Sequence, residues 1–400
     1  MKKFLLASAA TALCANAALA GGHGDEIKIG VLLGFTGPAE SIAAGMAPAA
    51  EAAIQEVSES GLLLGGKKVT PVRADATCVD AAAATAAAER LITAEGVSGI
   101  NGALCSGATG AALMNVAVPN GMVMISGSAT SPGLSHMNNE DNGLFFRTAP
   151  SDARQGVVMT EILREAGIDE VAVTYTNNDY GKGLADSFQA AFEAAGGTVT
   201  INAAHEDGKA DYSAEVGALA AAGGQRLVVA GYIDQGGPGI IRAALDAGAF
   251  DTFHLPDGMI GNAITDRFGT EINGSTGQVP GTDSPGAARL AEMGEAQGFD
   301  GTAPFAAEAY DASALILLAM QAANSNDPSV YKEKVMDVAN APGEQIYPGE
   351  LAKALEILAN GGDVDYVGAS AVELIGPGES AGNYRQIEVR DGKIETVKFR

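Results

Sequence analysis

Basic residues are scarce in this 400-residue sequence, which carries 24 lysines and arginines against 49 aspartates and glutamates, a formal net charge of −25. Removal of an N-terminal leader that contains Lys2 and Lys3 would change the balance to 22 − 49, or −27. A surface of this charge repels phosphate backbones and anionic lipid headgroups. We therefore expect no nucleic acid partner.

Metal and nucleotide motifs are also missing. The chain has four histidines, which lie far apart: His23, His136, His205 and His254. Zinc ligands usually occur at short spacings, so we expect no metal site. The first apolar run ends in residues 34–38, Gly-Phe-Thr-Gly-Pro, which lack the Gly-x-Gly-x-x-Gly of dinucleotide folds, and the chain contains no Gly-Lys-Ser/Thr loop. The sequence thus predicts no cofactor.

Long apolar runs are absent after the N-terminus, since residues 312–323 form the best candidate and number a dozen. A membrane-spanning helix needs about 20 apolar residues. At the N-terminus, Lys2 and Lys3 precede a short apolar core at 4–13, and Ala18-Leu19-Ala20 forms a small-x-small cleavage site. We interpret residues 1–20 as a cleaved signal peptide and expect the mature chain to be exported.

Cysteine is rare, with three in the chain. Cys14 lies in the leader, where lipid attachment is an alternative, although Leu13 stands where a lipobox has Gly or Ala. The mature chain keeps Cys78 and Cys105, and in an oxidising compartment the simplest arrangement is one disulfide between them. A reactive thiol is the alternative, and it would need an activating His or Lys nearby.

The rest of the chain alternates between strand-like and helix-like segments, and about 380 residues exceed what one core usually serves. This pattern predicts an α/β fold of two doubly wound parallel-sheet lobes. Strands are expected at 27–33, 69–74, 99–104, 122–126, 171–175, 198–203, 226–230 and 253–255. Helices are expected at 40–57, 80–94, 152–166, 180–195, 239–247 and 308–324, and short strands at 369–399.

No helical pattern fills residues 144–150 or 274–286, so we expect the chain to cross between the lobes there. A third crossing is expected near Gly368, and the apolar helix at 308–324 should pack on the first lobe. The predicted first lobe is then 21–147 plus 281–367. The predicted second lobe is 148–280 plus 368–400.

Small polar or aromatic groups follow most of the predicted strands. They occur at 77–80, 104–107, 126–130, 178–181, 231–232 and 256–258. An open parallel sheet presents ligand contacts at the carboxyl ends of its strands. Because the set contains no clear nucleophile, base or metal cluster, it indicates a protein that binds a small solute.

In this order and at these separations the segments resemble the type I periplasmic solute-binding proteins of ABC importers, specifically the branched-chain amino acid group. The resemblance runs from about Glu26 to beyond Asp311, and its strongest points are the cysteine pair, the run 126–130 and the run 179–183. It implies two lobes joined by three hinge strands, which close on a ligand and deliver it to an ABC permease in the inner membrane. It also implies a periplasmic protein, which we expect to be a monomer.

The resemblance places a carboxylate pocket in the first lobe. Ser106 would direct its hydroxyl to the ligand carboxylate, and Ser128, Ala129 and Thr130 would complete the pocket, with Ser128 acting mainly through its backbone. Hydroxyls and main-chain N–H groups near a helix N-terminus can bind a carboxylate without a full countercharge. Alternatively, Ser106 caps the helix that follows it, and Thr130 is a turn residue.

The second lobe would supply the ammonium side. Asp257 stands where the family commonly has an acid, usually Glu, that holds the ligand ammonium, and Tyr180 and Tyr232 would close the site, with a hydroxyl or a ring face toward the cation. Alternatively, Asp257 is a turn residue and both tyrosines are packed aromatics. Family members often have Tyr or Trp near the position of Ile42, and this difference leaves the ligand side chain open.

The predicted function is non-enzymatic capture of a neutral, branched-chain or other aliphatic amino acid by hinge closure. Alternatives are a related solute (an amide, urea, an aromatic or other carboxylic acid) and a ligand-sensing module for a receptor. Ser380 in a Gly-x-Ser-x-Gly pattern and Ser329 in a Ser-x-x-Lys pattern would suit a hydrolase. No histidine follows His254 and the supporting motifs are absent, so we interpret both as chance matches.

Overall fold

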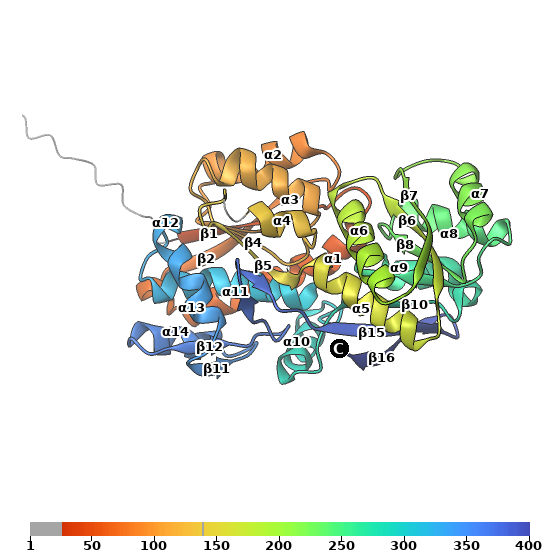
Figure 1. Ribbon diagram of the computed structural model, residues 1–400. Helices are drawn as coiled ribbons and strands as arrows, with labels where there is room; N and C mark the ends of the chain where they lie inside the picture. The colour runs from red at the N-terminus through yellow and green to blue at the C-terminus, as the bar shows by residue number, and fades with distance from the viewer. Residues whose placement is uncertain (1–25, 138–139) are drawn as a thin grey trace, which may run out of the picture.

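The computed structural model describes residues 26–137 and 140–400, and it contains two seven-stranded sheets, each with flanking helices (Figure 1). The predicted signal peptide, residues 1–20, lies outside the described residues. In the first sheet the strand order is β13-β14-β5-β4-β3-β1-β2. In the second it is β16-β15-β10-β9-β8-β6-β7. We call the halves built on these sheets the first and the second lobe.

The central strands of both sheets are parallel, as their buried apolar sequences predict. The first sheet contains β1 (Glu26–Leu33), β2 (Lys68–Asp75), β3 (Gly99–Gly102), β4 (Met124–Ser126), β5 (Phe145–Pro150), β13 (Leu374–Ile375) and β14 (Glu379–Ser380). The second contains β6 (Glu170–Thr176), β7 (Thr198–His205), β8 (Arg226–Ala230), β9 (Phe253–Leu255), β10 (Thr276–Pro280), β15 (Tyr384–Arg390) and β16 (Lys393–Phe399). The pair β11 (Glu344–Ile346) and β12 (Val364–Tyr366) forms a small separate sheet. The predicted α/β fold of two parallel-sheet lobes is confirmed.

The helices follow the strands in both lobes. Those of the first lobe are α1 (Glu40–Ser60), α2 (Ala81–Glu89), α3 (Ser106–Ala112), α4 (Pro132–Met137), α11 (Ala306–Ala322), α12 (Pro328–Tyr331), α13 (Val335–Ala339) and α14 (Leu351–Ala359). Those around the second sheet are α5 (Asp152–Glu165), α6 (Asp179–Ala194), α7 (Ser213–Ala222), α8 (Gly236–Asp246) and α9 (Asn262–Phe268), and α10 (Pro285–Gln297) follows β10. In the described part of the chain, every helix is too short or too polar to cross a membrane.

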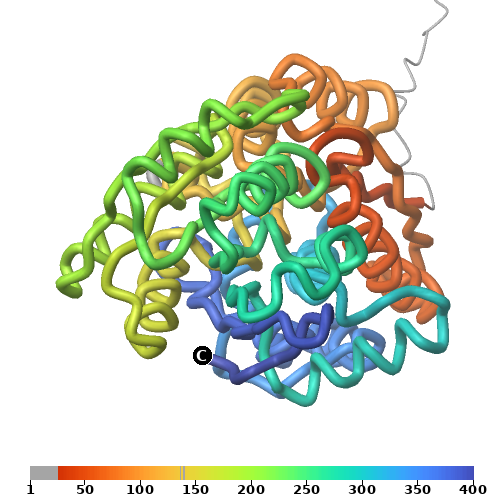
Figure 2. Tube along the Cα trace, turned by 90° about the vertical axis from the view of Figure 1, so that its right-hand side faces the viewer, coloured from red at the N-terminus to blue at the C-terminus, as the bar shows by residue number. Residues whose placement is uncertain are grey.

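Helix α11 lies in the centre of the first lobe, where its Ala- and Leu-rich sequence is buried almost throughout. It packs against α1 and against β4 and β5, and the tube view shows this distant part of the chain beside the N-terminal helix (Figure 2). The prediction that this helix returns to the first lobe is confirmed. The small alanine side chains on both helices allow the close contact.

Three crossings join the lobes. The first follows β5, which occupies most of the predicted crossing segment 144–150 and belongs to the first sheet up to Pro150, and it leads to α5; the second follows β10, inside the segment 274–286. The third differs in position: β13 and β14 still pair in the first sheet, so the chain changes lobe between Ser380 and Tyr384 and not near Gly368. The segment after Gly368 stays with the first lobe because buried Asp311 of α11 accepts hydrogen bonds from the backbone N–H groups of Ala369 and Ser370, both at 2.8 Å.

Candidate functional site

A small cavity lies between the lobes, beyond the carboxyl ends of the parallel strands. It is lined by Ile42, Leu104, Cys105, Ser106 and Ser128, by Tyr180, Tyr232, Asp257 and Gly258 of the second lobe, and by Phe305. Five of the seven predicted binding residues therefore meet at one place. Ala129 and Thr130 belong to the same loop after β4, but they are not among the residues that line this cavity.

On the first-lobe side, two serine hydroxyls brace the loop after β4. Ser106 begins α3, is buried, and accepts a hydrogen bond from the Ser131 N–H at 3.1 Å, so its hydroxyl holds the neighbouring loop instead of capping its own helix. The Ser128 hydroxyl donates to the Leu104 carbonyl at 3.0 Å. The Thr130 hydroxyl is buried and has no hydrogen-bond partner among the described residues. The first-lobe residues that line the cavity thus include two hydroxyl groups and no acidic side chain.

Arg147 fixes the same loop from behind. Its guanidinium, 1% exposed, donates to the carbonyls of Ala129 at 3.0 Å and Ser131 at 2.9 Å, and it pairs with Glu379 of β14 at 2.5 Å. A buried arginine is costly unless its charge is paired and its N–H groups are bonded, and these contacts meet both needs. Arg147 is not among the predicted site residues, although a charged residue inside the apolar run Phe145–Pro150 is a usable signal.

On the second-lobe side, Asp257 presents an unpaired carboxylate oxygen. It is 1% exposed; Oδ1 accepts from the Tyr180 hydroxyl at 2.6 Å and from the Gly258 N–H at 2.8 Å. Oδ2 is buried and has no hydrogen-bond partner in the described part of the chain. Burial raises the pKa of Asp257 above its usual 3.8, because a desolvated anion without a counter-charge is unfavourable. A cationic group at Oδ2 would relieve that penalty.

The two tyrosines form the wall next to Asp257. The rings of Tyr180 and Tyr232 stack with centroids 5.1 Å apart and planes inclined by 22°. Burial raises the pKa of both phenols, so both stay protonated and able to donate. Gly258 permits this packing, because a β-carbon there would lie 2.7 Å from the Tyr180 hydroxyl and 2.6 Å from the Gly231 carbonyl.

A second buried acid, Asp152, lies close to Asp257 at the first crossing. Asp152 is fully buried at the start of α5, and its Oδ1 accepts from the Gln155 side chain at 2.6 Å. The same Gln155 accepts from the backbone N–H of Asp257 at 3.3 Å. Burial, together with the nearby charge of Asp257, raises the pKa of Asp152 well above its usual value. Asp152 is not among the predicted site residues, because an acid in the first turn of a helix is common and gives no local signal.

The remaining lining is apolar and tight. Ile42, Leu104 and Phe305 are all buried, and Phe305 adopts φ +61° at the entry to α11, a conformation that is unusual for a bulky residue. Phe305 is not among the predicted site residues, since nothing in its local pattern distinguishes it from a core aromatic. The cavity volume is about 20 Å³, room for roughly one water molecule, so an amino acid can enter only if the walls part.

The disulfide prediction is confirmed. Cys78 and Cys105 are joined, with their Cα atoms 5.1 Å apart. Cys105 directly precedes Ser106, so the bridge ties the start of α3 to the loop after β2.

The two serines in hydrolase-like motifs, Ser380 and Ser329, are not in the surroundings of a nucleophile. Ser380 is buried in the short strand β14, and the Ser329 hydroxyl donates to Asp327 at 2.7 Å.

Two linked α/β lobes with a cavity lined from both sides, by hydroxyl groups on one wall and by a buried carboxylate on the other, are the architecture of a two-lobed solute-binding protein. The sequence profile of a family described as "Periplasmic binding protein" matches residues 26–342. The chain belongs to this family, with the type I fold and a place in the branched-chain amino acid group.

Two curated relatives represent its neighbours in sequence. The chain is 29% identical to the Leu/Ile/Val-binding protein homolog 3 of Brucella melitensis, over 83% of this chain and 87% of that protein. It is 27% identical to the chemotactic signal transduction system substrate-binding protein BasB of Halobacterium salinarum, over 93% of this chain and 89% of that protein. These relatives are solute-binding proteins, not enzymes.

Solved structures share the fold. The leucine binding protein LivK of Thermotoga maritima superposes with a TM-score of 0.76 at 21% identity, over 93% of this chain and 98% of that one. A solute binding protein of an ABC transporter from R. palustris, in complex with benzoate, superposes with a TM-score of 0.73 at 17% identity, over 94% and 96%. The same architecture thus accommodates both amino acids and aromatic acids.

Proposed function

We propose that this protein captures a neutral aliphatic amino acid, namely leucine, isoleucine or valine, between its lobes and delivers it to an ABC permease in the inner membrane. In this proposal residues 1–20 are a cleaved signal peptide, and the mature chain acts as a periplasmic monomer without catalytic activity. The observation that carries the proposal is the buried, unpaired Oδ2 of Asp257 opposite the hydroxyls of Ser106 and Ser128.

The geometry suits a zwitterion with an apolar side chain. The ammonium would bind Asp257, and the carboxylate would bind the Ser106 hydroxyl and N–H groups of the loop that Arg147 holds. The N–H groups of Ser128 and Ala129 donate to the Ser126 hydroxyl in this structure, so the ligand would take over those bonds. Ile42, Leu104 and Phe305 would cover the side chain. A benzoate-like ligand suits this lining less well, because it would leave the Asp257 oxygen buried without a partner.

Hinge closure would couple capture to transport. Because the binding groups come from both lobes, the ligand can contact all of them only when the lobes are closed, so its greater affinity for the closed form shifts the population toward that form. The relatives in the Leu/Ile/Val group support delivery to a permease. The BasB relative supports a second candidate, in which the closed form is read by a chemotaxis receptor.

A thermal-shift screen of the mature protein, from Gly21 onward, tests the ligand class after unfolding and refolding have removed bound solute. The probes are L-leucine, L-isoleucine, L-valine, benzoate, 4-hydroxybenzoate and urea. A ligand at about 100 times its Kd adds about 2.7 kcal/mol to the free energy of unfolding, which raises Tm by a few degrees. We expect this shift with the aliphatic amino acids alone.

The variant Asp257→Asn provides the residue-level test, and the exposed Asp251→Asn is its matched control. Asp257→Asn removes the charge but keeps the shape of the side chain, so leucine should no longer raise Tm while the fold remains intact. In Asp251→Asn, leucine should raise Tm as it does in wild type. If leucine raises the Tm of Asp257→Asn as much as it raises the Tm of wild type, Asp257 does not bind the ammonium. The same holds if benzoate alone raises the Tm of wild type. Leucine uptake and chemotaxis toward leucine in a deletion strain separate the two candidate partners.

A further inference from the structure

The two lobes also meet outside the cavity, at Ser41 and Asp234. Ser41 is in the first turn of α1, and Asp234 precedes α8 in the second lobe. The Ser41 N–H donates to Asp234 Oδ2 at 2.8 Å, and the Ser41 hydroxyl donates to the other carboxylate oxygen. In return, the Asp234 N–H donates to the Pro38 carbonyl at 3.1 Å. All three bonds cross from one lobe to the other, and the two between Ser41 and Asp234 join residues 193 apart in the sequence.

These bonds cap the N-terminus of α1, which has no side-chain cap of its own. A helix leaves its first four N–H groups without partners in the helix, and a side chain at the N-cap usually accepts from one of them. The N-cap of α1 is Ala39, whose side chain has no acceptor. Asp234 therefore serves as the cap from the other lobe, and it places a negative charge at the positive end of a 21-residue helix.

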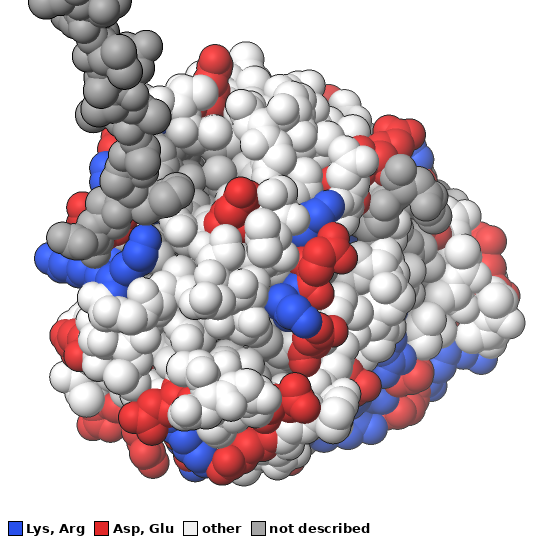
Figure 3. All heavy atoms as spheres, turned by 90° about the vertical axis from the view of Figure 1, so that its left-hand side faces the viewer, with Lys and Arg blue, Asp and Glu red and all other residues white. Residues whose placement is uncertain are grey.

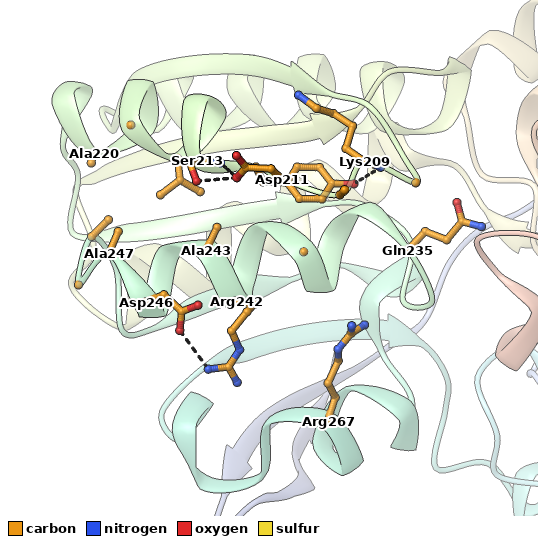
Figure 4. Close-up of a pocket in the computed structure, with 18 of the residues that line it drawn as sticks. Lys209, Asp211, Ser213, Ala220, Gln235, Arg242, Ala243, Asp246, Ala247 and Arg267 are labelled. Carbon is orange, nitrogen blue, oxygen red and sulfur yellow. Dashed lines mark hydrogen bonds and ion pairs between the residues drawn. The ribbon is translucent and has the colours of Figure 1, made fainter.

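The contact is adjacent to the cavity but separate from it. Ile42, which follows Ser41, and Tyr232, two residues before Asp234, both line the cavity, whereas neither Ser41 nor Asp234 does. Asp234 instead borders a wider hollow between α7 and α8, and Figure 4 shows the neighbouring Gln235 at one end of that hollow. Charged groups farther along this hollow pair locally, as Arg242 does with Asp246.

We propose that Asp234 is a closure latch: a carboxylate of the second lobe that caps α1 of the first lobe in the closed form alone, and so slows ligand release without contacting the ligand. Opening of the lobes would separate Asp234 from Ser41 and leave the start of α1 to water. The latch also holds Ile42 and Tyr232, one from each lobe, in their closed positions. The effect on affinity rests on the proposed function, whereas the effect on closure does not.

The test compares Asp234→Ala with Asp246→Ala, a matched control that removes another acid bordering the same hollow. Loss of a helix cap corresponds to a roughly 3- to 30-fold change in an equilibrium constant. We expect Asp234→Ala to raise the Kd for L-leucine by this factor, as measured by calorimetry. Most of the change should be a faster dissociation rate, which stopped flow measures. Asp234→Asn, which keeps one acceptor, and Ser41→Ala, which keeps the backbone bond, should show smaller changes. Asp246→Ala should match wild type.

A second readout does not depend on leucine. Fluorescent dyes are attached to cysteines introduced on each lobe, by Glu89→Cys on α2 and Glu193→Cys on α6. Single-molecule energy transfer between the dyes then measures how long the protein stays closed. We expect Asp234→Ala to shorten that dwell time several-fold and to leave the Tm of the ligand-free protein unchanged.

The outcomes separate the two proposals. If wild type does not bind leucine, the proposed ligand is wrong, and a shorter dwell time in Asp234→Ala still supports the latch. If leucine binds but both its dissociation rate and the dwell time in Asp234→Ala stay within about two-fold of wild type, the latch is refuted. A lower Tm of ligand-free Asp234→Ala would also refute it, because the residue would then stabilise the fold in both forms.

Discussion

Glu308 and Asp311 are two buried carboxyl groups one turn apart on α11, and their surroundings differ. Asp311 accepts hydrogen bonds from the hydroxyl of Tyr366 and from the backbone and hydroxyl of Ser370, which limit the effect of burial, so its pKa rises to about 6. Burial, together with the nearby charge of Asp311, raises the pKa of Glu308 to about 8, and its own backbone N–H and the charge of Arg385 offset only part of this effect. At neutral pH Glu308 is therefore mostly protonated.

This difference predicts a pH-dependent stability. Between the ordinary pKa of 4.5 and about 8, the folded protein keeps a proton on Glu308 that the unfolded chain has lost. The stabilisation from that proton is complete below pH 4.5 and disappears as the pH rises through about 8. In Glu308→Gln, the free energy of unfolding measured by urea denaturation from pH 6 to 8.5 should fall less steeply than in wild type. Parallel curves for the two proteins would contradict this assignment.

Among the elements, α3 depends most clearly on a covalent tie. Its N-cap residue, Cys105, makes no side-chain cap bond and is joined to Cys78 in the loop after β2. In that loop Thr77 and Cys78 have φ values of +55° and +76°, which are unfavourable for non-glycine residues and are held by the surrounding contacts. The bridge thus fixes a strained loop and, through Cys105, the position of Ser106.

Removing the bridge should lower stability and weaken binding together. With a sequence separation of 27, the chain-entropy model gives about 3–4 kcal/mol for the double variant Cys78→Ala/Cys105→Ala. Urea denaturation measures this loss, and calorimetry with leucine measures the effect of a less fixed Ser106. Reduced wild type is the control and should behave like the variant. A loss below about 1 kcal/mol would show that native packing alone holds the loop.

At the scale of the whole molecule, the dominant feature is the net charge of −25. Figure 3 shows one face on which basic side chains stand singly or in small groups among more numerous acidic ones. The ion pairs among the described residues are mostly at exposed side chains, where solvent screens each attraction and leaves it little effect on stability. Repulsion among the excess acids therefore remains as a long-range destabilising effect.

Salt should relieve this repulsion. Raising NaCl from about 10 mM to 1 M shortens the Debye length from about 30 Å to about 3 Å. We expect the Tm of the ligand-free protein to rise by several degrees over this range, with most of the rise below about 0.2 M, where screening changes fastest. Sucrose at matched osmolality is the control for general exclusion effects. A Tm that stays constant or falls would mean that the local ion pairs outweigh the net charge.

Local pattern predicted eight strands of the two sheets and six of the fourteen α-helices in the described part of the chain, and it marked the polar segments that contain five residues of the cavity. It missed β5 and β10, where only crossings were expected. Strand sequences such as Glu26–Leu33 are apolar and buried, and the ends of parallel strands meet at one edge, so residues that follow them converge. Position at the strand ends marked the segments that contain Ser106, Ser128 and Asp257, and the resemblance to the binding-protein family implied these particular residues. The third crossing was placed too early because the bonds from Asp311 that hold residues 369–370 to the first lobe have no local signature.

The sequence by itself determined the alternation of strands and helices, the pairing of the two mature cysteines and the polar groups at the strand ends, because each depends on periodicity, counting or position within one segment. Tertiary structure alone decided the rest. Arg147 reaches the cavity loop only through strand packing, Asp152 approaches Asp257 only at the crossing, and Asp234 caps α1 only when the lobes meet. Each of these contacts joins residues remote in sequence, and their free energy depends on burial and charge, which arise when the chain folds.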